Sequence, residues 1–149
     1  MNRTIPRSAA STTTNVGFLL AKASQRFNEL LLDGFADRGF PEVRASYGSV
    51  LVPLFEQDGR RVGELAALSR LSKQAMTGLV KLCEDDGLVV RERDADDGRA
   101  FRVFLSARGR RLQAVADEVL RELDEELVRS LGERKRDALI GALRGVIDL

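Results

Sequence analysis

The stretch from Ser69 to Gly87 constrains this chain most, because it forms an amphipathic helix with an unusual polar face. Read as a helix that begins at Ser72, it has an apolar stripe at the i, i+1, i+4, i+5, i+8 spacing of a buried face: Ala75, Met76, Leu79, Val80 and Cys83. The opposite face carries cations, an amide and a hydroxyl, with no carboxylate before Glu84: Lys73, Gln74, Thr77, Gly78 and Lys81. Solvated faces ordinarily mix both signs, whereas a face that lies against phosphates and base edges should not. Our working hypothesis is that this helix reads DNA.

The distribution of charge along the chain agrees with that hypothesis. The net charge is only +1, but residues 60–111 hold 12 Lys and Arg against 8 Asp and Glu. Residues 1–59 are balanced at 6 and 6, and residues 112–149 hold 6 against 9. The basic excess therefore surrounds the amphipathic helix, a pattern typical of a centre that faces nucleic acid.

Composition narrows the class of protein. A chain of 149 residues, 44% hydrophobic and 32% charged, is typical of one soluble domain, and no apolar run reaches the ~20 residues of a membrane span. The first 15 residues lack the apolar core of a secretory signal, and the single cysteine fits a reducing compartment, so we expect a cytoplasmic protein. There is no histidine. We therefore expect no metal and no cofactor, and, without a nucleophile–base pair or a glycine-rich phosphate loop, no enzyme activity.

The first half of the chain predicts two helices after a tail. Residues 1–14 are rich in Ser and Thr, which predicts a flexible tail. Asn15 suits the N-cap of a long helix that ends at Gly39. A second helix is predicted from about Val43 to Phe55, and Pro53 should kink it or end it early.

The middle and the second half predict a helix-turn-helix, a hairpin and two more helices. A very short strand at 61–62, a short helix over 63–69 and the helix from Ser72 make the helix-turn-helix, which Gly87 closes. Strands over 88–93 and 100–105, joined by turn residues, make a wing. A long helix capped by Ser106 should run to about residue 130, and a last helix over about 133–147. The fold class is mainly α with a small β-wing (α+β), a winged helix-turn-helix.

This order of elements, and several short motifs, resemble the MarR family of winged-helix transcriptional regulators. The motifs are Val62-Gly63-Glu64-Leu65-Ala66, Leu71-Ser72-Lys73-Gln74-Ala75-Met76, Gly87-Leu88-Val89, Asp94-Ala95-Asp96-Asp97-Gly98-Arg99 and Leu105-Ser106-Ala107-Arg108-Gly109. The resemblance implies a single domain over 15–149, with dimerisation helices at 15–42 and 106–149 around a winged helix-turn-helix at 43–105. Ala95 departs from the family, which often has proline there, and so do Gly78 on the reading helix and Pro53 in the second helix.

The reading helix supplies the candidate DNA contacts. Ser72, Lys73, Gln74 and Thr77 lie at its N-terminal end, where glutamine can bond adenine and lysine can reach guanine or phosphate. The alternative is a solvated face with a routine serine cap. Arg70 and Lys81 flank that face and suit phosphates, or else are ordinary surface cations; these six residues are the helix-turn-helix candidates.

The wing holds three aspartates, which is unexpected beside a polyanion, so either its tip faces solvent or the aspartates hold arginines. The resemblance implies that Asp97 organises the wing, paired with Arg93, and that Arg99 enters the minor groove. Family members bind aromatic effectors, and Phe18, Phe27 and Tyr47 are candidates to line such a pocket, with ordinary core packing as the equal alternative. Cys83 is assigned to the core.

Together these features predict a sequence-specific DNA-binding regulator, a homodimeric repressor of a pseudo-palindromic operator that a small effector releases. Two-fold symmetry would place the reading helices about one DNA turn, ~34 Å, apart. The alternative is a winged helix used as a protein-interaction module, which would show no salt-dependent DNA binding.

Overall fold

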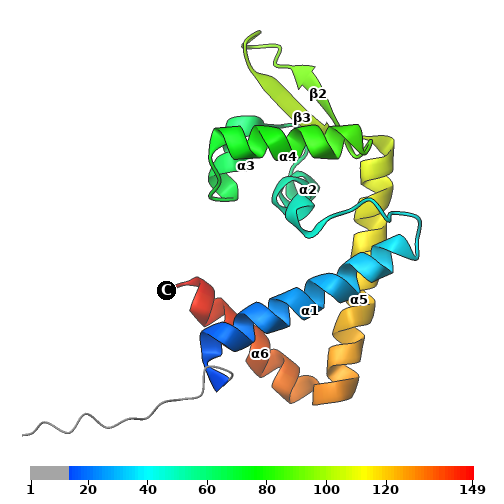
Figure 1. The fold of residues 1–149 in the computed structure, drawn as a ribbon, viewed down its shortest axis with the longest axis vertical. Coiled ribbons are helices and arrows are strands. Elements are labelled where there is room, and N and C mark those ends of the chain that lie inside the picture. Colours follow the sequence, from blue (N-terminus) through cyan, green and yellow to red (C-terminus); the bar gives the residue numbers. More distant parts are fainter. Residues whose placement is uncertain (1–13) are drawn as a thin grey trace, which may run out of the picture.

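The structure is a computed structural model that describes residues 14–149 and is predominantly helical (Figure 1). In chain order its elements are α1 (Val16–Ala36), the 3₁₀ turn η2 (Ala45–Tyr47), α2 (Gly48–Glu56), β1 (Arg60–Arg61), α3 (Val62–Leu68), α4 (Lys73–Asp85), β2 (Val89–Arg93), β3 (Phe101–Leu105), α5 (Ala107–Leu131) and α6 (Glu133–Ile147). Nearly all of the tail expected over residues 1–14 lies outside the described residues. The predicted element types and their order are confirmed.

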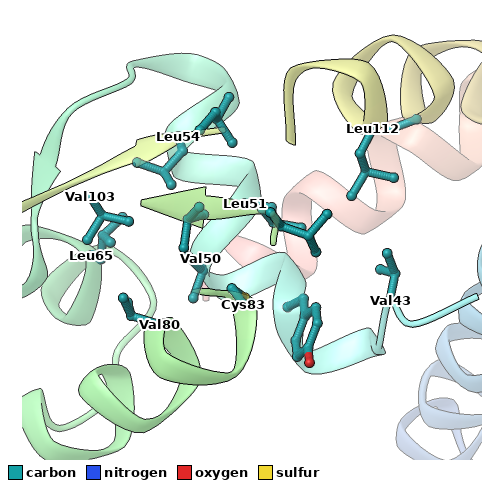
Figure 2. Close-up of a cluster of buried hydrophobic side chains, with 14 of the residues drawn as sticks. Val43, Val50, Leu51, Leu54, Leu65, Val80, Cys83, Val103 and Leu112 are labelled. Carbon is teal, nitrogen blue, oxygen red and sulfur yellow. The ribbon is translucent and has the colours of Figure 1, made fainter. Parts of the chain in front are cut away.

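One end of the molecule is a winged module. There α3, α4 and the β2–β3 hairpin lie together, and α2 packs beneath them (Figure 1). The three strands form an antiparallel sheet in the order β1-β3-β2, in which Arg60 pairs with Val103 and Val89 with Leu105. Side chains from α2, α3, α4, β2 and β3 meet in one core (Figure 2), whose fully buried members include Val50, Leu54, Leu65, Met76, Val80, Cys83 and Val103. The assignment of Cys83 to the core is confirmed, and burial raises the pKa of its thiol to about 12.

The predicted helix caps are formed as hydrogen bonds. Backbone N–H groups donate to Asn15 Oδ1 (from Gly17, 2.8 Å), Ser72 Oγ (from Ala75, 3.1 Å) and Ser106 Oγ (from Gly109, 3.0 Å). Gly87 ends α4 in the left-handed region at φ +76°. Local sequence signals therefore fix where α1, α4 and α5 begin and where α4 ends.

The second helix differs from its prediction. It begins at Gly48 rather than near Val43, after a 3₁₀ turn, and it continues through Pro53 to Glu56, so the expected early end at the proline is wrong. Pro53 has no N–H for the carbonyl of Ser49, four residues earlier. The hydroxyl of Ser69 donates to that carbonyl instead, at 2.8 Å, and so replaces the missing helix bond.

The buried stripe of α4 is narrower than predicted. Met76, Val80 and Cys83 are buried, at the i, i+4, i+7 spacing of one helix face, and Leu79 is partly buried beside them. Ala75 is exposed, contrary to the prediction. The exposed surface of α4 therefore extends from the polar face onto Ala75.

The other end of the molecule consists of α1, α5 and α6, with α5 as the link to the winged module (Figure 1). The helices α1 and α5 pack closely: a Cβ added to Gly34 would lie 2.6 Å from Val119 Cγ1. None of the side chains of α6 is buried. Within residues 14–149, no helix is both long and apolar enough to span a membrane.

Candidate nucleic-acid interface

Several polar side chains are exposed at the N-terminal end of α4, the predicted reading helix. Lys73 and Gln74 are exposed and, within the described part of the chain, their side chains make no hydrogen bond or ion pair. Ser72 is occupied by its capping role, and the Thr77 hydroxyl donates to the carbonyl of Lys73 at 2.8 Å. Of these four side chains, those of Lys73 and Gln74 therefore have their full hydrogen-bonding capacity available for an external partner.

The two flanking cations are held differently. Arg70 is exposed and occupies the left-handed region at φ +52°, where it ends α3 as a glycine ordinarily would. Leu71 N–H then donates to Ala66 O at 3.0 Å. Lys81 forms an ion pair with Asp85, Nζ to Oδ1 at 2.6 Å. Exposed pairs of this kind contribute little to stability, so a phosphate can compete for Lys81.

A groove of about 480 Å³ separates the wing from the N-terminal ends of α3 and α4. Its lining contains four cations, Arg61, Lys73, Arg91 and Arg99, against Glu64 and Asp97. The remaining lining residues are Val62, Gly63, Thr77, Ala100 and Phe101. The groove thus joins the reading helix to the wing in one surface that is predominantly positive at its charged positions.

The wing is anchored by a carboxylate that the sequence reasoning did not single out. Asp94 is 4% exposed; its Oδ2 accepts from Arg61 Nε at 2.7 Å and lies 3.2 Å from Arg102 Nε. Its Oδ1 accepts from the Asp96 N–H at 3.0 Å. That backbone hydrogen bond first, and then the two guanidinium groups, hold the pKa of Asp94 below its ordinary value against the effect of burial. Arg61 and Arg102 are direct cross-strand neighbours, so Asp94 also offsets the repulsion between these two like charges.

The expected pairing of Asp97 with Arg93 is not among the ion pairs of the described residues. Asp97 Oδ1 instead accepts from the Arg99 N–H at 3.0 Å, and Arg93 Nη1 donates to Gly98 O at 3.1 Å. Both residues therefore shape the wing tip through its backbone. The Arg99 side chain is exposed and borders the groove. The three aspartates were the available signal for the anchor, but the choice of Asp94 depends on the β1–β3 register, which short sequence patterns do not give.

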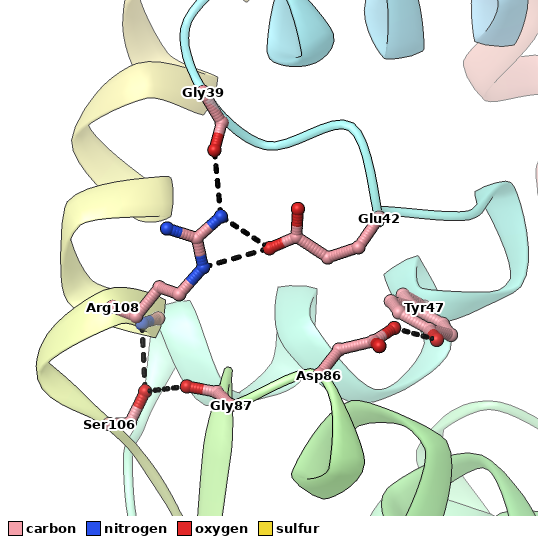
Figure 3. A network of polar contacts seen from close by, with 8 residues as sticks. Gly39, Glu42, Tyr47, Asp86, Gly87, Ser106 and Arg108 are labelled. Atoms are coloured by element: carbon pink, nitrogen blue, oxygen red, sulfur yellow. Dashed lines mark hydrogen bonds and ion pairs between the residues drawn. The ribbon is translucent and has the colours of Figure 1, made fainter.

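The three aromatic residues proposed for an effector pocket are not brought together. Tyr47 is fully buried in the winged core, and its hydroxyl donates to Asp86 Oδ2 at 2.5 Å (Figure 3). Burial, and then that hydrogen bond, raises the pKa of Tyr47 to about 12. Phe18 is exposed and Phe27 partly buried, both in α1. For Tyr47, the alternative of ordinary core packing is therefore confirmed. A cavity of about 350 Å³ does lie between α1 and α5, beside Arg38 and Arg129, but none of the three aromatic residues lines it.

A polar junction links the winged module to α5 (Figure 3). Arg108 donates to Glu42 Oε1 at 2.6 and 2.8 Å and to Gly39 O at 2.7 Å, and its guanidinium lies 4.3 Å from the centre of the Phe40 ring. The Ser106 hydroxyl donates to Gly87 O at 2.6 Å. The start of α5 is therefore tied both to the loop after α1 and to the end of α4.

The two helices α3 and α4, their turn and the three-stranded sheet define a winged helix-turn-helix protein. A family model described as the MarR family matches residues 54–100, the segment that contains this unit. Over that segment the chain is similar to the MarR family, and the likeness of the whole fold described next is also to transcriptional regulators.

Individual proteins of known function or structure are also similar to this chain. The HTH-type transcriptional repressor Rv2887 of Mycobacterium tuberculosis (strain H37Rv) is 33% identical over 78 residues, 52% of this chain and 56% of the repressor. The match thus spans about half the length of that curated relative. The structure of the transcriptional repressor CouR bound to a 23-mer DNA duplex has a TM-score of 0.75 at 27% identity, over 89% of this chain and 92% of CouR. The structure of Rv2887 with salicylic acid has a TM-score of 0.63 at 24% identity, over 89% and 96%, which shows a shared fold.

Proposed function

We propose that this protein is a sequence-specific DNA-binding transcriptional regulator that acts as a homodimeric repressor. The observation that carries the proposal is the exposed N-terminal end of α4, where the unpaired side chains of Lys73 and Gln74 adjoin the cationic groove below the wing. A helix that presents an amide and a cation and carries no carboxylate before Glu84 suits the donor and acceptor pattern of the major groove.

Each part of the surface has a separate role in this proposal. The α4 helix enters the major groove, where Gln74 and Lys73 contact base edges. Arg70 and Lys81 contact phosphates on either side, and Arg99 at the wing tip reaches the minor groove. The anchor at Asp94 fixes the wing to β1, the strand that leads directly into α3, because Arg61 belongs to β1 and Arg102 to β3.

The homodimer is proposed from apolar surface that the protomer leaves exposed. Large apolar side chains of α1 and α6 face solvent, among them Val16, Leu19, Leu139, Leu143 and Val146. Exposed apolar surface of this extent is typical of an association site. A two-fold dimer through these helices would present two α4 helices to a pseudo-palindromic operator.

An effector that releases DNA belongs to the proposal as well. The related Rv2887 is known in complex with salicylic acid, a small aromatic acid. A ligand that binds one arrangement of the dimer better than the other would change DNA affinity by its difference in affinity for the two. Phe18 and Phe27 stay candidates for contacting it, whereas Tyr47 is part of the core.

The test begins with the selection of genomic fragments that the protein retains, which yields an operator. Binding is then measured for the parent and for Gln74→Ala on operator and on random DNA, over a range of salt concentrations. We expect Gln74→Ala to lose on the order of tenfold or more on the operator, because a good bidentate base contact contributes ~1–3 kcal/mol, and little on random DNA. Gln57→Ala at the end of α2 is the matched control, since Gln57 is also exposed but does not line the groove.

Two results would count against the proposal. Equal loss on both DNAs would reduce Gln74 to a non-specific contact. DNA affinity without salt dependence would favour the protein-interaction module, because each neutralised phosphate adds to the slope of log affinity against log salt.

A further inference from the structure

Phe101 on the wing is an aromatic side chain that is only partly buried in the folded protomer. It follows the face of β3 that also carries Val103 and Leu105, which are both buried, yet Phe101 is 40% exposed. It borders the groove opposite Lys73 and Thr77 of α4. The ring therefore extends the apolar face of the sheet out of the core and into the proposed DNA-binding surface.

Two arginines flank this ring. Arg93 pairs with Phe101 directly across the strands, and Arg91 lies two residues away on the same face of β2. Each guanidinium carbon is 5.7 Å from the centre of the ring, which is cation–π distance. The ring thus lies against two cations, of which Arg91 also lines the groove.

Both guanidinium groups are fixed in place but not saturated. Arg91 donates to Glu84 through Nε and Nη2, both at 3.1 Å, and Arg93 donates through Nη1 to Gly98 O at 3.1 Å. A guanidinium has five N–H donors, so each keeps donors for another acceptor. The cluster of Phe101, Arg91 and Arg93, here called the wing platform, combines an exposed apolar surface with oriented donors.

We propose that the wing platform binds one sugar–phosphate strand of the DNA duplex, with the Phe101 ring against a deoxyribose and the two arginines on the phosphates that flank it. This chemistry matches the backbone, which alternates an apolar sugar with an anion. Bases in a duplex are stacked and present only their edges in the grooves. The face of an aromatic ring on the wing can therefore pack against a deoxyribose but cannot stack on a base. The inference rests on the proposed function and adds a contact that is independent of base sequence.

The test compares DNA affinity and its salt slope among variants of the full chain. Phe101→Ala should bind operator and random DNA on the order of tenfold more weakly, because apolar contact area is lost, with an unchanged salt slope. Arg93→Gln should lower the slope by about 0.9, as expected for one phosphate contact. Val90→Ala is the matched control: Val90 is 43% exposed but lies on the opposite face of the same hairpin, so its affinity should equal the parent's.

A further variant separates DNA contact from a purely internal role. Phe101→Met keeps apolar bulk but has no ring for the arginines, so near-parental affinity supports the sugar contact. A loss as large as that of Phe101→Ala would overturn it, since the ring would then act only by holding the cations. Thermal unfolding followed by circular dichroism checks that each variant is folded.

Other outcomes distinguish this inference from the proposed function. If Phe101→Ala binds like the parent while Gln74→Ala loses its operator, the wing platform is wrong and the regulator stands. If the parent itself shows no salt-dependent binding, the regulator fails. A preference for single-stranded DNA that disappears in Phe101→Ala would overturn the sugar contact in favour of base stacking.

Discussion

At the scale of single residues, Asp94 has the largest structural consequence in the wing. Its carboxylate joins β1 to the β2–β3 hairpin through Arg61 and Arg102, and it also caps the turn through the N–H of Asp96. A carboxylate that accepts hydrogen bonds from the Asp96 N–H and Arg61 and also faces Arg102 is stabilised in its charged form, so the folded state lowers its pKa. The stabilisation that Asp94 provides is therefore linked to pH.

We predict that Asp94→Asn lowers the free energy of unfolding at neutral pH and that the difference from the parent narrows in acid. A carboxyl with a lowered folded pKa contributes stability that is fully present above its unfolded pKa, near 3.9, and is lost as pH falls through the folded pKa. Urea unfolding at pH 7, 5, 4 and 3 measures the difference. Asp96→Asn is the control, because the Asp96 side chain is exposed. A difference that stays constant down to pH 3 would contradict the assignment.

At the scale of elements, α2 is stabilised by a side chain from the end of α3. Pro53 leaves the Ser49 carbonyl without its helix donor, and the Ser69 hydroxyl at the end of α3 supplies the bond at 2.8 Å. The bond also fixes the end of α3 against α2. It therefore helps to position the turn that leads into the reading helix.

Much of the fold could be predicted from the sequence because its signals are local. Asn15, Ser72 and Ser106 cap their helices through atoms two or three residues away, and Gly87 ends α4 by its own backbone angle. The continuation of α2 through Pro53 could not be predicted, because it depends on a donor 20 residues away from the carbonyl. The candidate site likewise has a part that could be predicted from the sequence and a part that could not. The exposed face of α4 follows from helix periodicity, whereas the Asp94 anchor and the wing platform depend on strand register.

We predict that Ser69→Ala costs about 1 kcal/mol or more of unfolding free energy, because it leaves the partly buried Ser49 carbonyl unsatisfied. In a Pro53→Ala background the cost should shrink, since residue 53 then has an N–H for the same carbonyl. A double-mutant cycle measured by urea unfolding gives the coupling between the two positions. Strictly additive effects would show that the hydroxyl does not replace the missing helix bond.

At the scale of the whole molecule, the winged module is joined to the α1, α5 and α6 helices by a network of polar contacts. Arg108 ties α5 to Glu42 and Gly39, and Ser106 ties it to Gly87 at the end of α4. A Cβ at Gly109 would lie 2.1 Å from the Leu88 carbonyl oxygen, so only glycine allows this approach. We therefore expect a shift of α5 to be transmitted to the end of the reading helix through a few short contacts, which would couple the proposed dimer to the proposed DNA surface.

The proposed dimer can be tested by substitution on α6, because none of its side chains is buried in the protomer. Leu139, Leu143 and Val146 follow the i, i+4, i+7 spacing of one face. We predict that Leu143→Glu, which places a charge where Leu143 is 37% exposed, yields a monomer by light scattering at micromolar concentration. Operator affinity should then fall on the order of a hundredfold, because two linked half-sites become one.

Val52→Glu is the matched control for this change, because Val52 is 52% exposed on α2 in the winged module and the substitution adds the same charge. It should leave both the dimer and its stability largely unchanged. A Leu143→Glu protein that stays dimeric would remove α6 from the interface. A monomer that retains full operator affinity would instead break the link between two-fold symmetry and DNA binding, since the spacing of two α4 helices would then have no role in recognition.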